Sequence, residues 1–151
     1  MKVLLLNPPI CIQDVYGRFA QLASFQPPTG LAHLAGYLLQ YGHDVEIVDA
    51  NCLSLTIEDI VKEIKKYPPD LVGLYTISYN FPVIETLTKS IREAVPNLKM
   101  VAGGPHVTFM PEQTLQETPI DFCVMGEGEE TLHELVEHLE DGAKDFSGIE
   151  G

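Results

Sequence analysis

The chain has 151 residues, enough for one domain with a sizeable core, and its 45% hydrophobic and 21% charged residues are ordinary for a globular protein. A formal net charge of −13 argues against a nucleic acid or an anionic membrane as partner, because both need a basic surface. The three cysteines stand far apart without a CxxC or CxxxCxxC motif, so local spacing builds neither a zinc nor an iron–sulfur site. Their odd number and the absence of a signal-peptide core predict a reducing compartment, and we expect a cytoplasmic protein.

Short apolar runs alternate with amphipathic helical patterns along the chain. We expect the runs to be strands buried on both faces, and they cover residues 3–6, 45–48, 71–77, 100–102 and 122–125. Apolar residues spaced three and four apart predict helices that begin near Leu31, Ile57, Ile84 and Leu132, with a short one after Pro111. The alternation predicts an α/β, doubly wound (flavodoxin-like or Rossmann-like) fold. Its five-stranded parallel sheet would have the order 2-1-3-4-5, in three layers.

The periodicity ends after Asp141. We therefore expect a domain over residues 1–141 and a linker over residues 142–151 that leads toward a further domain absent from this sequence. One long irregular stretch, residues 8–30, lies inside the domain, and loops of that length are usually functional or mobile. Tyr16 and Arg18 in this stretch are candidates for covering a ligand, the alternative being an ordinary exposed loop.

In an open parallel sheet, ligands bind beyond the carboxyl ends of the strands, where the strand order reverses. Two glycine pairs at neighbouring strand ends would make a broad, low floor for a flat ligand, although tight strand–helix turns also use glycine. Four predicted loops meet at this edge and supply the candidate cofactor-binding residues Asn7, Pro8, Thr76, Ile77, Ser78, Tyr79, Asn80, Gly103, Gly104, Pro105, His106, Gly126, Glu127, Gly128 and Glu129.

The five histidines form no metal-binding motif. His106 is the one placed at the carboxyl edge, where it is either a ligand contact or a polar turn residue. We expect His33 to be structural, and His43, His133 and His138 to be solvated. No catalytic residue and no metal ligand is assigned to this chain.

The chain lacks the residues that other known ligands of this fold require. A dinucleotide site requires GxGxxG after the first strand, whereas Asn7-Pro8-Pro9-Ile10 stands there and its two prolines remove N–H donors. A P-loop and the Ser-, Thr- and Gly-rich phosphate loop of flavodoxins are also missing. A phospho-acceptor receiver domain needs acids after the first strand and an Asp ending the third, and this chain has Asn7 and Tyr75-Thr76 at those places.

Four segments, in the right order over nearly the whole chain, resemble the N-terminal cobalamin-binding domain of B12-dependent radical-SAM proteins. Within that family the pattern is similar to proteins labelled anaerobic magnesium-protoporphyrin IX monomethyl ester cyclase. The segments are Lys2-Val3-Leu4-Leu5-Leu6-Asn7-Pro8-Pro9, Pro28-Thr29-Gly30-Leu31 running into Leu34-Ala35-Gly36-Tyr37-Leu38, Gly103-Gly104-Pro105-His106, and Gly126-Glu127-Gly128-Glu129.

The resemblance implies a corrinoid, cobalamin, that lies across the strand ends with its nucleotide tail beside the sheet. The better-known cobalamin domains carry DxHxxG after the first strand, and the histidine of that motif ligates cobalt. This chain has Asn7-Pro8-Pro9-Ile10-Cys11-Ile12 there. The resemblance therefore implies base-off binding without a protein histidine ligand.

The resemblance also implies a longer enzyme, a methyltransferase or a cyclase-like protein, whose radical-SAM domain would hold the 4Fe-4S cluster and S-adenosylmethionine. The cluster motif CxxxCxxC is absent here, so we expect no turnover from this chain alone. Two alternatives stay open: a non-catalytic doubly wound interaction or regulatory module, and a small nucleotide-binding domain.

Overall fold

The computed structural model describes residues 1–10, 17–22 and 27–151, and its centre is one parallel sheet. The sheet has five strands in the order β2-β1-β3-β4-β5, and every neighbouring pair is parallel. This confirms the predicted fold. The strands are β1 (Lys2–Asn7), β2 (Asp44–Asp49), β3 (Leu71–Tyr75), β4 (Lys99–Gly103) and β5 (Phe122–Val124).

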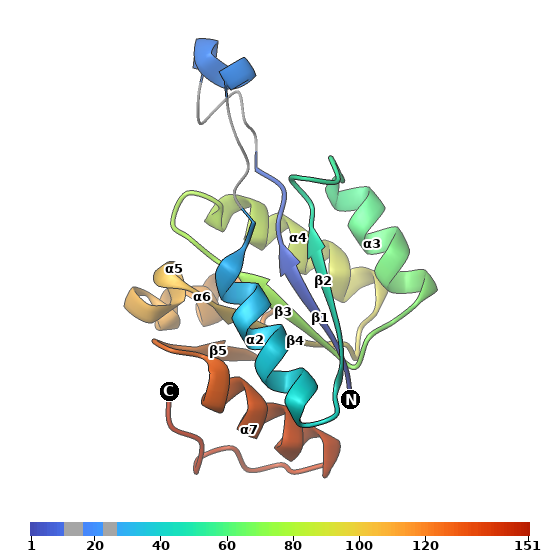
Figure 1. The fold of residues 1–151 in the computed structure, drawn as a ribbon, viewed down its shortest axis with the longest axis vertical. Coiled ribbons are helices and arrows are strands. Elements are labelled where there is room, and N and C mark those ends of the chain that lie inside the picture. Colours follow the sequence, from blue (N-terminus) through green and yellow to red (C-terminus); the bar gives the residue numbers. More distant parts are fainter. Residues whose placement is uncertain (11–16, 23–26) are drawn as a thin grey trace.

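Helices cover both faces of the sheet, as Figure 1 shows. The helices α2 and α7 lie on one face, and α3 and α4 lie on the other, while α5 and α6 lie beside β4 and β5 (Figure 1). The bounds are η1 (Gly17–Leu22), α2 (Thr29–Gln40), α3 (Ile57–Lys66), α4 (Phe81–Ala94), α5 (Pro105–Phe109), α6 (Pro111–Glu117) and α7 (Glu129–Glu140).

Alternation along the strands divides the core into two clusters. In β1, Leu4 and Leu6 face the cluster under α3 and α4, while Val3 and Leu5 face the cluster under α2 and α7. The unbroken apolar run of β1 is therefore explained by helices on both of its faces.

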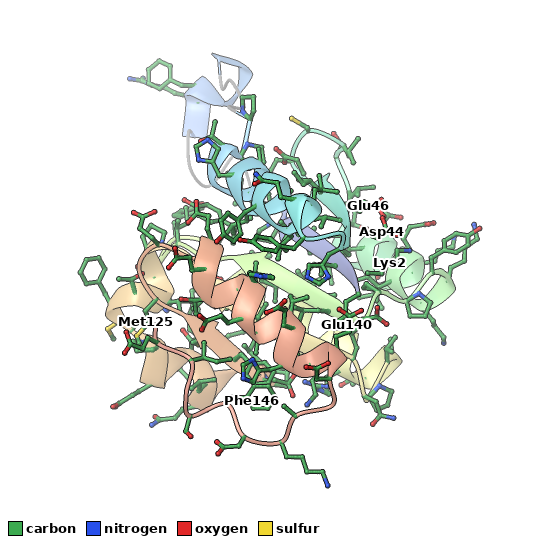
Figure 2. The ribbon with its side chains drawn as sticks, turned by 60° about the horizontal axis from the view of Figure 1, so that its bottom comes forward. Lys2, Asp44, Glu46, Met125, Glu140 and Phe146 are labelled. Atoms are coloured by element: carbon green, nitrogen blue, oxygen red, sulfur yellow. The ribbon has the colours of Figure 1, made fainter. Side chains whose placement is uncertain are left out.

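The strand β2 lies at the edge of the sheet, and the prediction that it is buried on both faces was wrong. Within the described residues it pairs only with β1, and Ile47 retains 39% of its surface exposed. Figure 2 shows Asp44 and Glu46 at this edge. An apolar run in the sequence cannot show whether a second strand will cover its outer side.

The segment after Asp141 lies along α7 and the outer strand. The Phe146 ring contacts the Phe122 ring edge-on, with 5.0 Å between centroids, and Ile149 packs against the same cluster. The Thr131 hydroxyl donates a hydrogen bond of 2.8 Å to the Glu150 carbonyl. Figure 2 shows Phe146 on the loop beyond α7. That this segment links the domain to another one stays a prediction.

Two histidines expected to be solvated are buried where α2 and α7 meet, so that expectation was wrong for them. His43 is 7% exposed and His133 is 8% exposed. The His133 ring stacks on Tyr41 with 3.8 Å between centroids, and its centroid lies 5.9 Å from that of His43. His33, expected to be structural, is exposed on α2. The helical spacing predicted which face of α7 is apolar, but it could not predict that Tyr41 would stack on His133 and bury it.

The surroundings of His43 predict that the stability of the domain depends on pH. Burial, the N-terminal amine 3.4 Å from its Nδ1 and the nearby His133 lower the pKa of His43, against the opposing effect of Glu140 and Glu137. A histidine whose pKa is lower in the folded state binds more protons when unfolded, so stability falls as the pH drops through about 6.5.

We expect the free energy of unfolding in urea to decrease between about pH 7.5 and pH 5.5, and to decrease less in His43→Gln. His33→Gln, a change on an exposed face of α2, is the matched control and should keep the parent pH dependence. Equal pH dependence in all three proteins would contradict this role for His43.

Candidate functional site

A glycine in the middle of β3 opens the sheet on the face covered by α2 and α7. Gly73 pairs in register with Leu5 on one side and with Val101 on the other, and both of these point to this face. A Cβ at position 73 would lie 2.8 Å from Leu5 Cδ2 and 3.7 Å from Val101 Cγ1. Any side chain at 73 would therefore displace the tip of Leu5 and fill the space above the strand.

The residues paired across neighbouring strands form rows, and the next row on this face, two residues nearer the carboxyl edge than Gly73, also contains a glycine. Gly103 pairs with Tyr75 of β3 and with Val124 of β5. A Cβ at position 103 would make only ordinary contacts, 3.7 Å from the Val124 carbonyl oxygen and 4.0 Å from its Cβ. Gly103 is thus not required by packing of the sheet, and its missing side chain leaves the surface open.

A pocket of about 160 Å³ lies over these two rows. Leu31 and Leu34 of α2 and Leu132 of α7 face it from the covering helices. Its rim consists of Gly30, Gly104 and the loop from Gly126 to Glu129. An apolar cavity of about 150 Å³ is known to hold a benzene-sized ring, so a flat aromatic group suits this pocket.

The glycines of the rim differ in what they do. Gly104 has a φ of +106°, and a Cβ there would lie 2.8 Å from the Thr76 carbonyl oxygen, so the turn itself requires glycine. A Cβ at Gly128 would lie 3.3 Å from Leu34 Cδ2, which shows how closely the start of α7 approaches α2. Gly126, with a φ of +70°, has no atom within 4 Å of its Cβ position.

The structure brings only part of the predicted site into the pocket lining. Gly103, Gly104 and the residues 126–129 line it. The remaining candidates do not; they are Asn7, Pro8, Thr76, Ile77, Ser78, Tyr79, Asn80, Pro105 and His106.

Thr76 and Asn80 are buried and hold the turn after β3. The Asn80 amide donates to the Tyr75 carbonyl at 3.1 Å and its Oδ1 accepts from the Ile77 N–H at 3.0 Å. The Thr76 N–H donates to the Gly103 carbonyl at 2.8 Å, which joins this turn to the end of β4. The Asn80 side chain and the Thr76 backbone therefore hold this loop in place at the carboxyl edge.

His106 is buried at the start of α5, away from the pocket lining. Its ring stacks on Phe81 of α4 with 4.2 Å between centroids, and its Nδ1 lies 3.1 Å from the Ser78 hydroxyl. Its Nε2 is buried and has no hydrogen-bond partner among the residues that the structure describes. Within the described part of the chain, no group of three or more His, Cys, Asp or Glu side chains is arranged to hold a metal ion.

The loop after β1 is fastened to the loop after β2. The Asn51 amide donates to the Pro8 carbonyl at 2.9 Å, and its Oδ1 accepts from the Ile10 N–H at 2.7 Å. Tyr16 lies outside the described residues, and Arg18 is exposed on η1.

The apolar part of the pocket was not predicted from the sequence. Leu31, Leu34 and Leu132 have the spacing of ordinary core residues, so nothing in the sequence separates them from the core. Gly73 did carry a signal, because a glycine inside a buried strand often marks the close approach of a ligand.

No helix in the described ranges is long and apolar enough to cross a membrane.

The chain resembles known proteins in both sequence and fold. Its residues 17–136 match the model of the B12 binding domain family. It is 43% identical over 157 residues to "Uncharacterized methyltransferase PH0819" of Pyrococcus horikoshii, covering 100% of this chain and 32% of that protein. It is 36% identical over 155 residues to "Anaerobic magnesium-protoporphyrin IX monomethyl ester cyclase" of Synechocystis sp., covering 100% of this chain and 30% of that protein.

Among solved structures, the radical S-adenosylmethionine methyltransferase TsrM from Kitasatospora setae, with cobalamin and a [4Fe-4S] cluster bound, has the same fold. The TM-score is 0.81 at 24% identity over 99% of this chain and 26% of that chain. The cobalamin-dependent radical enzyme OxsB, with aqua-cobalamin and S-adenosylmethionine bound, gives a TM-score of 0.81 at 22% identity over 99% of this chain and 20% of that chain. The chain spans about a third or less of the length of these relatives. Since the family match covers most of the sequence, the chain belongs to the B12 binding domain family.

Proposed function

We propose that this domain binds cobalamin base-off, with the corrin ring over the carboxyl ends of the strands and the nucleotide base in the pocket beneath α2 and α7. The observation that carries the proposal is the pair of glycines, Gly73 and Gly103, that open two successive rows of the sheet below that pocket. The pocket suits the group, because it is lined mainly by aliphatic side chains and its rim is built of glycines.

The rim would hold the corrin ring. Gly104 and the loop 126–129 offer backbone close to the pocket mouth, where the corrin amide side chains could hydrogen-bond. The loops Asn7-Pro8, 76–80 and 105–106 stay predicted contacts at the same edge. No residue of this chain is proposed as catalytic.

The reaction would belong to a longer protein. Relatives described as methyltransferases and cyclases extend well beyond the matched region. We therefore propose that a radical-SAM domain, holding the 4Fe-4S cluster and S-adenosylmethionine, follows this domain. Bound cobalamin would supply a cobalt centre that carries a methyl group or assists a radical step.

Incubation with hydroxocobalamin, desalting and a visible spectrum test the binding itself. We expect the protein fraction to keep a corrinoid spectrum. A colourless protein fraction at micromolar concentration would contradict the proposal.

An electron-paramagnetic spectrum of the bound cob(II)alamin tests the axial ligand. We expect no nitrogen superhyperfine splitting, and no change in His106→Ala, because His106 is enclosed by Phe81 and Ser78. The affinity should fall modestly at most in that variant, since one hydrogen bond contributes about 0.5–1.5 kcal/mol. A nitrogen pattern lost in His106→Ala would identify that histidine as the ligand, and one that persists would show that the base or another histidine coordinates cobalt; either result contradicts the proposed mode.

A further inference from the structure

Among the described residues, aliphatic side chains line the depth of the pocket. Leu5 and Val101 flank Gly73 on the floor, at 1% and 3% exposure. The side chains that face this floor from the helices are Leu31, Leu34 and Leu132. The backbone N–H and C=O groups of the floor belong to paired parallel strands, so they are engaged within the sheet.

Polar side chains of the described lining lie nearer the carboxyl edge. Tyr75 belongs to the upper row, and Glu127 and Glu129 belong to the rim, where Glu127 is exposed. A ligand group that enters the pocket as far as Gly73 therefore leaves water and becomes surrounded by aliphatic side chains. Each polar atom it carries would lose its hydrogen bonds with water and find no side chain to replace them.

We infer that this pocket selects corrinoids by the polarity of their lower base. It favours a phenolic base, whose ring carries no nitrogen, and it accepts a benzimidazole with one uncoordinated ring nitrogen better than a purine, whose several ring nitrogens and amino group would be buried unpaired. The inference rests on the proposed function, because it requires the nucleotide base to occupy this pocket. Val101 is the specificity-determining residue at its centre, since its Cγ1 lies 3.7 Å from the Cβ position of Gly73.

The test compares corrinoids that differ only in the base. Dissociation constants would be measured by equilibrium dialysis for cobalamin, cresolyl cobamide, adeninyl cobamide and cobinamide, which has no base. The decisive quantity is the ratio of cresolyl to adeninyl cobamide affinity, compared between the parent and a variant of the pocket floor, because any cost of dissociating adenine from cobalt is the same for both proteins. We expect cresolyl cobamide to bind at least about tenfold more tightly, the factor that about 1.4 kcal/mol represents.

A substitution on the floor should change the ratio. Val101→Thr keeps the shape of the side chain and adds a hydroxyl that can hydrogen-bond to a purine. The preference for cresolyl over adeninyl cobamide should therefore become several-fold smaller. Val48→Thr is the matched control, because Val48 lines a separate groove on the opposite face with Leu4 and Ile60, and it should leave the ratio unchanged.

The outcomes separate the two proposals. Equal affinity for cresolyl and adeninyl cobamides, or tighter binding of the adeninyl form, would overturn the selectivity and leave cobalamin binding in place. Binding of none of the four corrinoids would overturn the proposed function itself. A ratio that moves equally in Val101→Thr and Val48→Thr would overturn the assignment of Val101.

Discussion

Gly103→Leu is expected to weaken cobalamin binding by about tenfold to a hundredfold while the domain stays folded. Overfilling a packed site costs about 1–3 kcal/mol. At about 1.4 kcal/mol for each factor of ten, this corresponds to the expected increase in the dissociation constant. The backbone at 103 does not have a positive φ, and its Cβ position has only ordinary contacts, so the leucine would extend into the pocket without straining β4. Dissociation constants for cobalamin and urea unfolding curves measure the two effects separately.

Gly148→Leu is the matched control for this experiment. A Cβ at Gly148 meets no atom within 4 Å, and the residue is exposed near the end of the chain, so binding should equal that of the parent. Position 104 is less suitable for this test than position 103. A side chain at 104 would meet the Thr76 carbonyl and adopt a strained φ, so it would reduce stability together with binding. A folded Gly103→Leu protein that binds cobalamin as the parent does would place the site elsewhere.

Arg92→Ala is expected to lower the free energy of unfolding by about 3 kcal/mol, because several acceptors lose their donor together. The Arg92 guanidinium donates to the carbonyls of Pro96, Leu98 and Pro119 at 2.9, 2.7 and 2.8 Å, and to Asp121 Oδ2 at 2.8 Å. It thereby joins the end of α4 to the starts of β4 and β5. Urea unfolding at neutral pH measures the loss.

Asp121 is the charged partner in this network. Burial alone would raise the pKa of the Asp121 carboxyl, but hydrogen bonds from the Met100 N–H, Arg92 and Lys99 hold it below its ordinary value. The carboxyl is therefore ionised at neutral pH, and in Arg92→Ala it would lose the less exposed of its two cationic partners and keep only Lys99.

Lys89→Ala is the matched control on the same helix. Lys89 is 56% exposed and pairs with Glu85 at 3.5 Å, so its removal should change stability by less than about 0.5 kcal/mol. A loss in Arg92→Ala no larger than in Lys89→Ala would show that the network does not stabilise the domain.

Local patterns in the sequence were enough to predict the fold and the edge of the sheet at which the candidate site lies. The apolar run from Val3 to Leu6 predicted a buried strand, and the right-handed crossover of parallel strands then limited the order of the sheet. The glycines at 103 and 104 stand directly after a strand, so their place at the carboxyl edge also follows from the sequence.

The pocket and the environment of the histidines were decided only by tertiary structure. Leu34 and Leu132 come from helices almost a hundred residues apart, and their spacing is that of any core residue, so only the packing of α2 and α7 distinguishes a pocket wall from core. His133 is buried because Tyr41 stacks on it, and His106 turns away from the pocket lining because Phe81 stacks on it. A sequence period specifies which face of an element is apolar, whereas the partner on that face depends on residues distant along the chain.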